Sequence, residues 1–402
     1  MPGQDLVLRW LAPEKDGLAG MDSTMAKCSH DAARLMGRRR NANECFGACN
    51  KDDNPWQLSG GDIKWYTDWL AVRGVNLFIP HAFYYSIRDE RPPDVGPHSI
   101  WWAHYEAWST YWRRLSWLMT DIDLHAEAAV LCRNRDLCPD TVRPLFERQI
   151  GFQYIPESYF SACTVEDGAL CLHGHRYTAV LGDKALFPDA AHSEVSALEP
   201  DCRCDPPQPM LRCASFNKEG RACWLLVNEG NAPIRTQLTL PVDAPLCRYD
   251  LWNGQPCACP AERTAKGACL PLELPARGSL LLFTCTARES EALPLPPTYL
   301  SLAAPDFTLA DEDAAHLTKT YRATLQITAT ELQTATPLLT LPGQEMAELT
   351  VNGQPAGTSF WPPHKFPLAG LLTPGKNTLT LILTGSPANR YGKHPVPYGL
   401  ER

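Results

Sequence analysis

The first 120 residues alternate between helix-like and strand-like patterns of apolar side chains. Stretches 23–38 and 60–74 have apolar residues three and four positions apart, which predicts two helices. Ser23 is expected to cap the first helix, and Gly37 and Gly74 to end the two. Stretch 41–49 predicts a short strand with turn residues after it, and the apolar stretch 75–80 predicts a second strand. Helix, strand, helix and strand with short connections predict parallel βα units.

A third helix is predicted over 99–119 from a stripe of large side chains. The apolar positions Trp101, Tyr105, Trp108, Trp112 and Leu115 recur every three or four residues. They therefore lie on one face of a helix, and most of this stripe is expected to be core.

The rest of the chain changes pattern twice. Residues 121–205 mix buried strands with one amphipathic helix, which predicts a small α/β domain. Residues 206–290 are all strands and turns, and residues 291–402 alternate apolar and polar positions around an Asn352-Gly353 hairpin turn. Pro-rich stretches separate these parts. A multidomain α/β plus all-β chain is predicted, with domains at 1–120, 121–205, 206–290 and 291–402.

Composition excludes several classes of partner. The formal net charge is −8 and the sequence pI is about 5.8, so a nucleic-acid partner is not expected. No apolar stretch approaches the roughly 20 residues that span a bilayer, so no membrane partner is expected. The Cys pairs 202/204 and 257/259 have no matching ligand motif, so we expect neither metal nor cofactor. Cysteines in apolar runs, together with the lack of a signal peptide, predict a cytoplasmic protein.

Candidate chemistry lies where the two predicted strands of the first domain end. The first strand presents Glu44, and the second runs into His81, Tyr84 and Tyr85. Catalytic groups gather at the carboxyl ends of parallel strands, and a carboxylate ringed by aromatic side chains suits sugar chemistry. The residues expected to stack on a sugar are Trp101 and Trp102, which begin the third helix.

Glu44 and His81 could instead have purely structural roles. Glu44 could form an ion pair with Arg38 or Arg40, and His81 could be a core histidine with satisfied hydrogen bonds.

Several long segments resemble one family of enzymes. "MAKCSHDAARLMGRRRNANECFGA", "DIKWYTDWLAVRGVNLFIPHAFYYS" and "RPPDVGPHSIWWAHYEAWSTYWRRLSWLM" resemble the end of the catalytic barrel of large bacterial glycoside hydrolases. These are the α-L-rhamnosidase-like enzymes and relatives of the β-galactosidase and β-glucuronidase family. The resemblance implies the C-terminal part of a (β/α)8 barrel at 1–120 and a shortened flavodoxin-like domain at 121–205. It implies a β-sandwich at 206–290 and a galactose-binding-like jelly roll at 291–402.

The resemblance also implies roles for residues. "NECFG" matches the seventh barrel strand, which makes Glu44 the nucleophile of a retaining enzyme or the base that activates water in an inverting one. The general acid of the family lies on an earlier strand than the chain contains. The resemblance thus implies an N-terminally truncated hydrolase of plant-type or host glycans, inactive alone or completed by an upstream chain. The alternative is a non-catalytic carbohydrate-binding protein that uses the jelly roll and the Trp-rich surface.

Overall fold

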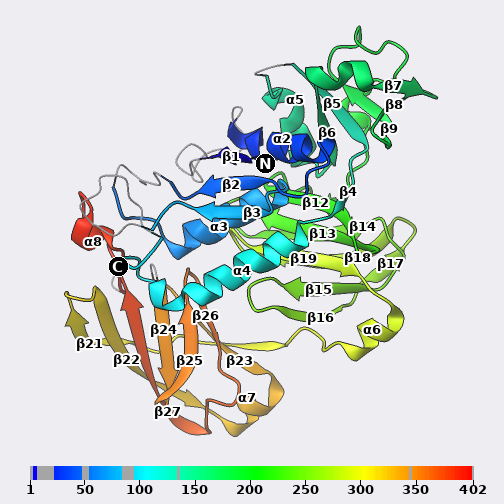
Figure 1. The fold of residues 1–402 in the computed structure, drawn as a ribbon. Coiled ribbons are helices and arrows are strands. Elements are labelled where there is room, and N and C mark those ends of the chain that lie inside the picture. The colour runs from blue at the N-terminus through cyan, green and yellow to red at the C-terminus, as the bar shows by residue number, and fades with distance from the viewer. Residues whose placement is uncertain are drawn as a thin grey trace. The chain divides into compact units, whose positions relative to one another are not determined.

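The chain forms two compact units in a computed structural model (Figure 1). The first comprises Met1–Cys45, Trp65–Ile79 and Ala107–Leu295, and the second Phe46–Lys64, Pro80–Glu106 and Pro296–Arg402. The structure describes residues 3–6, 22–47, 54–83, 95–133, 136–343 and 346–400. In these ranges no helix has both the length and the apolar character needed to cross a bilayer. The division into four domains stays a prediction.

A three-stranded sheet and its helices correspond to the predicted βα units. The sheet has the order β1-β2-β3, and β1 and β2 are parallel. Its strands are β1 (Gly3–Asp5), β2 (Ala42–Cys45) and β3 (Leu77–Pro80). The helices that alternate with them are α2 (Asp22–Leu35), α3 (Gly60–Val72) and α4 (Tyr105–Leu118). Arrows β2 and β3 point the same way in Figure 1. The predicted order of helices and strands is confirmed, whereas the barrel stays a prediction.

A second, parallel sheet has the order β10-β5-β6 and two apolar faces. Its strands are β5 (Ala128–Cys132), β6 (Phe152–Pro156) and β10 (Ala179–Leu181), with helix α5 (Pro139–Glu147). Val130 packs with Val142 and Leu145 of α5, while Leu131 of the other face packs with Leu170. Leu170 belongs to the small antiparallel sheet of β7 (Thr164–Glu166), β8 (Ala169–Leu172) and β9 (His175–Tyr177). Both faces are covered, as a parallel sheet requires.

Two antiparallel sheets complete the first unit and share one apolar core. The larger sheet consists of β4 (Asp123–Leu124), β12 (Leu211–Lys218), β13 (Arg221–Asn228), β15 (Leu246–Asp250), β16 (Gln255–Cys259) and β19 (Ser279–Thr284). Its six strands lie in the order β16-β15-β19-β13-β12-β4. The four-stranded sheet consists of β11 (Arg203–Asp205), β14 (Ile234–Leu240), β17 (Glu262–Thr264) and β18 (Gly267–Leu274). Alternate residues such as Trp224, Leu226 and Leu282 fill the core against Leu238 and Leu270. Helix α6 (Ala287–Ala292) follows β19.

The second unit contains two further sheets around its own core. The larger sheet consists of β21 (Thr308–Asp313), β22 (Thr318–Ile327), β24 (Met346–Val351), β25 (Gln354–Ser359) and β27 (Gly375–Thr384). The smaller consists of β20 (Tyr299–Leu302), β23 (Thr336–Leu341) and β26 (His364–Pro367), and two short helices are α7 (Ala329–Thr334) and α8 (Ala388–Tyr391). Asn352 and Gly353 both have positive φ between β24 and β25, so the predicted hairpin is confirmed. The jelly roll stays a prediction.

Distant parts of the chain meet in the second unit. The buried Asn54 side chain donates to the His394 carbonyl (2.8 Å) and accepts from the Lys393 backbone N–H (2.8 Å). The Ser386 hydroxyl donates to the Trp56 carbonyl (3.1 Å), and the Trp56 ring packs on Tyr391 with centroids 5.3 Å apart. The segment that contains Asn54 and Trp56 is therefore an integral part of this unit.

Candidate active site

Glu44 lies at the carboxyl end of β2 and differs in burial from its neighbours. The side chains of Asn43 and Cys45 are fully buried, whereas Glu44 is half-buried. The Ser29 hydroxyl of α2 donates to Oδ1 of Asn41 (2.6 Å), which places Asn41 on the side of α2. Because side chains alternate along an extended chain, Asn43 and Cys45 also point to the helix side. Glu44 then points to the opposite face of the sheet, away from α2.

A second carboxylate is brought beside Glu44 by the first strand. Asp5 of β1 is the register partner of Glu44 in the parallel pair, and its side chain is exposed. Adjacent strands lie about 4.8 Å apart, and residues in register project to the same face. Two carboxylates therefore stand on neighbouring strands where both strands end. The sequence analysis missed Asp5 because its strand has three residues and no apolar run.

Of the two arginines considered as partners of Glu44, Arg40 binds other groups in the described part of the chain. The Arg40 guanidinium donates to the Asn76 carbonyl (3.2 Å) and to Oγ1 of Thr120 (2.8 Å). Arg39, between the two candidates, binds both carboxylate oxygens of Asp121 (2.7 and 2.5 Å). The basic run thus stabilises the chain around residues 120 and 121.

Exposed aromatic rings gather in the second unit, where the chain leaves β3. Phe83 is 56% exposed and Trp102 is 37% exposed. The Phe83 ring meets Trp102 and Tyr105 edge-on, with centroids 5.5 and 5.8 Å away. We call Phe83, Trp102 and Tyr105 the aromatic cluster. Exposed ring faces of this kind stack on the apolar face of a sugar ring.

The other predicted site residues are placed differently. His81 is half-buried, and its ring lies next to Gly47, where an added Cβ would be in van der Waals contact with it at 3.5 Å. Trp101 is only 2% exposed, so its ring offers no free face, whereas its neighbour Trp102 does. Tyr84 and Tyr85 lie outside the described residues.

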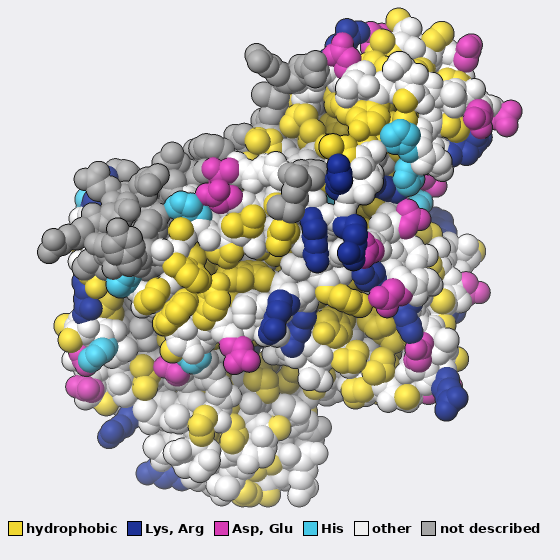
Figure 2. Space-filling model, in the orientation of Figure 1, with side chains coloured by type: hydrophobic (Ala, Val, Ile, Leu, Met, Phe, Trp, Pro, Cys, Tyr) yellow, Lys and Arg dark blue, Asp and Glu magenta, His cyan; other side chains and the backbone are white. Residues whose placement is uncertain are grey.

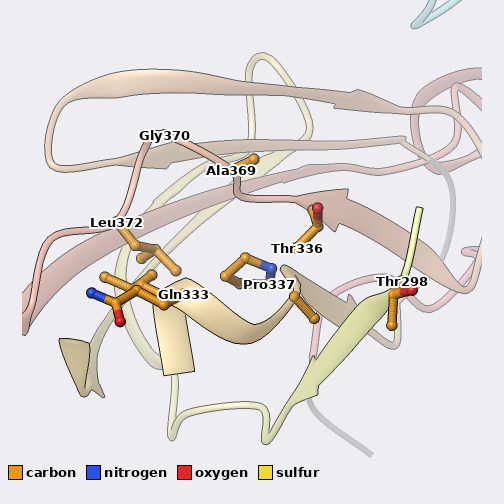
Figure 3. Close-up of a pocket in the computed structure, with 9 residues that line it drawn as sticks. Thr298, Gln333, Thr336, Pro337, Ala369, Gly370 and Leu372 are labelled. Carbon is orange, nitrogen blue, oxygen red and sulfur yellow. The ribbon is translucent and has the colours of Figure 1, made fainter. Parts of the chain in front are cut away.

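A cavity of about 570 Å³ lies elsewhere in the second unit, beside α7 (Figure 3). Figure 3 shows Gln333 projecting from the helix, Thr336 and Pro337 at the start of β23, and Ala369 and Gly370 opposite them. Among the described residues, no aromatic or charged side chain lines this cavity, so none there can stack on a sugar or form an ion pair with it. Nor do three or more His, Cys, Asp or Glu side chains converge as a metal site anywhere in the described part of the chain.

No model of a known protein family and no curated protein matches this sequence. The structure, however, is similar to that of a rhamnosidase from Novosphingobium sp. PP1Y, with a TM-score of 0.68 and 15% identity over 97% of this chain and 47% of that one. The two share a fold. This chain spans about half the length of the rhamnosidase.

Two β-galactosidases are more weakly similar. One, a GH42 enzyme from G. stearothermophilus, has a TM-score of 0.43 and 10% identity over 70% of this chain and 59% of that one. The other, from Bacillus circulans sp. alkalophilus, has a TM-score of 0.36 and 9% identity over 65% and 58%. Scores this low carry no argument about the fold. The expected likeness to a glycoside hydrolase is confirmed by the rhamnosidase at the level of the fold, whereas family membership stays a prediction.

Proposed function

We propose that this chain is part of a glycoside hydrolase in which Glu44 acts on the anomeric carbon. The observation that carries the proposal is the pair of carboxylates, Asp5 and Glu44, in register on parallel strands. Glycoside hydrolysis needs two carboxyl groups, one to donate a proton and one to act as nucleophile or base. The similarity of fold to a rhamnosidase supports this chemistry over other uses of paired carboxylates.

The short spacing of the two strands favours a retaining mechanism. In that mechanism the Glu44 carboxylate attacks the anomeric carbon as the bond to the leaving oxygen breaks, and an acid protonates that oxygen. Water then hydrolyses the glycosyl–Glu44 ester, which regenerates the carboxylate. We propose Asp5, which the chain supplies next to Glu44, as this acid, and an acid from an upstream part of the protein as the alternative.

The aromatic cluster is proposed as a sugar-binding surface of the second unit. Trp102 and Phe83 supply exposed rings, and His81 of the same unit supplies a hydrogen-bonding group. Trp102→Ala should therefore weaken binding of a saccharide to this surface by about three- to tenfold, since a stacking contact contributes about 0.5–1.5 kcal/mol.

The test is release of nitrophenol from aryl rhamnosides, galactosides, glucuronides and arabinosides. The chain alone and the longest polypeptide that its gene encodes are assayed side by side, because a general acid contributes about 10²–10⁴-fold. The panel also shows which sugar the enzyme releases, and we propose that its natural substrates are plant-type or host glycans. Activity only in the longer polypeptide, or only after a second chain is added, would support completion by an upstream part.

Variants of the active form identify the carboxylates. Glu44→Gln should lower turnover by several orders of magnitude with substrate binding retained, because the amide cannot attack or accept a proton. Glu44→Ala should regain turnover with azide and yield a glycosyl azide, and Asp5→Asn should lose activity mainly on substrates with poor leaving groups. Glu262→Gln, at an exposed position of β17, is the matched control. Unchanged turnover in Glu44→Gln excludes the role of Glu44.

The second candidate is carbohydrate binding without catalysis, which the exposed aromatic cluster favours. It predicts saturable binding of an oligosaccharide that Trp102→Ala weakens, with no glycoside turnover in any form of the protein.

A further inference from the structure

A cavity of about 620 Å³ lies in the first unit between α4 and the six-stranded sheet. It opens on the face of the sheet that points away from the shared core: Cys223, Leu281 and Phe283 line the cavity, while their neighbours Trp224 and Leu282 fill the core. Its volume is that of a small-molecule site, for which about 300–1,000 Å³ is usual.

The walls of this cavity are mainly apolar and aromatic. Cys223 and Leu281 are buried, Tyr249 and Phe283 are half-buried, and the Trp117 ring of α4 is 59% exposed. An exposed tryptophan on a docked helix leaves a large ring face in contact with water, and covering that face with a ligand is favourable.

Helix α4 is anchored next to the cavity. The Trp108 ring packs on Trp252 with centroids 5.0 Å apart. The Arg114 guanidinium donates to the Leu251 carbonyl (3.1 Å). The helix that carries Trp117 is therefore held in place before any ligand binds.

The rim of the cavity is cationic although the chain is acidic. Arg113, Arg114, Lys218 and Arg221 line it with one carboxylate, Glu219, which gives a local charge of +3 in a chain of net charge −8. Arg221 is neutralised by Glu289, which lies outside the lining (2.6 Å). Figure 2 shows Lys and Arg side chains gathered beside hydrophobic ones in the middle of the face drawn.

Neither Arg113 nor Lys218 forms an ion pair with a carboxylate in the described part of the chain. Arg113 is exposed and donates to Oγ1 of Thr110 (2.8 Å). Lys218 is 7% exposed, donates to the Trp117 carbonyl (3.1 Å) and lies 4.7 Å from the centre of the Trp117 ring. A neighbouring cavity of about 430 Å³ shares Arg113, Trp117 and Lys218, and its lining also includes the carboxylates of Asp121 and Glu219.

We propose that this cavity binds a small aromatic acid, a flat ring that carries one carboxylate, sulfonate or sulfate group. The ring would lie against Trp117 and Phe283, and the anionic group would take the positions that Arg113 and Lys218 offer. This proposal is independent of glycoside hydrolysis, because none of these residues belongs to the candidate active site.

The probe is anilinonaphthalene sulfonate, whose fluorescence rises in an apolar site, and its comparison is phenyl-naphthylamine, the same ring system without the sulfonate. The sulfonate should bind the folded chain at least about tenfold more tightly than the uncharged compound, and raising NaCl from about 50 to 500 mM should weaken it. Equal affinity for the two compounds would overturn the proposal.

Substitutions locate the site. Arg113→Gln and Trp117→Ala should each weaken binding of the sulfonate by about three- to tenfold. Both side chains are exposed, so the fold is expected to persist, and near-ultraviolet circular dichroism checks it. Arg235→Gln on β14 and Tyr299→Ala on β20 are matched exposed controls that should leave the affinity unchanged. If the two cavity variants bind the sulfonate as the parent does, the probe lies elsewhere and the proposal fails.

Discussion

His30 is a buried imidazole held against the backbone of Gly74. Its Nδ1 lies 3.1 Å from the Gly74 carbonyl oxygen, and its Nε2 is buried without a hydrogen-bond partner in the described residues. A Cβ at Gly74 would come within 2.3 Å of the ring, and the φ of +92° there also requires glycine. Desolvation lowers the pKa of His30 from 6.5 to about 4, opposed by the nearby carboxylate of Asp31 and reinforced by Lys27 and Arg34.

Acidification should therefore destabilise the first unit. The unfolded chain binds a proton at His30 below pH 6.5 and the folded chain only below about pH 4, so stability falls as the pH drops through this window. The expected loss from His30 is about 2 kcal/mol between pH 7 and pH 5, measured by urea unfolding. His30→Gln should flatten this dependence, whereas His316→Gln at an exposed position should not. An equal slope in parent and His30→Gln would contradict the prediction.

Single residues differ in how well sequence alone predicts them. The position of Glu44 in a short strand and the end of α3 just before Gly74 follow from local patterns in the sequence. Asp5 could not be found, because its importance comes from pairing with a strand that lies almost forty residues away. Trp101 and Trp102 are neighbours of opposite exposure because a 3-10 turn precedes α4, and helical periodicity does not extend into that turn.

Helix α7 is a short element held by its first turn. The Glu331 backbone N–H donates to Oγ1 of Thr328 (3.2 Å), and the Thr328 N–H donates to the Glu331 carboxylate (2.8 Å). This capping box satisfies backbone donors that a helix of six residues cannot satisfy internally. Thr286 and Glu289 form the same arrangement at α6.

Removing the cap should loosen α7. Thr328→Ala is expected to lower the free energy of unfolding of the second unit by about 1 kcal/mol. Hydrogen exchange of peptides that cover α7 measures the effect, and Thr286→Ala should produce the same loss at α6 but none at α7. Unaltered exchange of α7 in Thr328→Ala would show that tertiary packing, and not the cap, holds this helix.

Elements with strong local signals were predicted and short ones were not. The periodicity of α2 and α3 and the Asn352-Gly353 turn are each contained in a few neighbouring residues. In contrast β4 has two residues and exists because it pairs with β12 far along the chain. The Thr-x-x-Glu signatures of α6 and α7 were present in the sequence and could have located both helices.

At the scale of the molecule, a buried ionic cluster joins parts of the first unit. Glu229, next to β13, pairs with Arg73 after α3 and with Arg212 of β12 (2.9 Å), and all three side chains are at most 1% exposed. The Arg73 guanidinium also lies 3.6 Å from the centre of the Trp69 ring. Burial lowers the pKa of Arg73, and Glu229 opposes this effect.

Loss of the shared carboxylate should destabilise the whole unit. Glu229→Gln leaves two guanidinium groups buried without a counter-ion, which costs about 3–5 kcal/mol. Urea unfolding of the two forms measures this loss. Glu273→Gln removes one partner of the exposed pair with Arg235 and should cost less than about 1 kcal/mol. Similar losses in the two variants would mean that burial does not govern the strength of these pairs.

The second unit should depend on Asn54 in a comparable way. Asn54→Ala removes the side chain that binds residues 393 and 394, with the loss of three part-buried hydrogen bonds. We expect a loss of about 1–3 kcal/mol and faster hydrogen exchange over residues 386–398. Exchange in α5 of the first unit is the internal control and should not change.

The bonds between Asn54 and Lys393 also bear on synthesis of the protein. The two residues are 339 positions apart. At about 5–20 residues per second, a ribosome needs roughly 20–70 s to make the second partner after the first. Throughout that interval Trp56, which is buried in the finished unit, lacks Tyr391, on which its ring packs. The second unit must therefore fold after the intervening chain has been translated, and its early segment is a natural client for chaperones that bind apolar nascent chain.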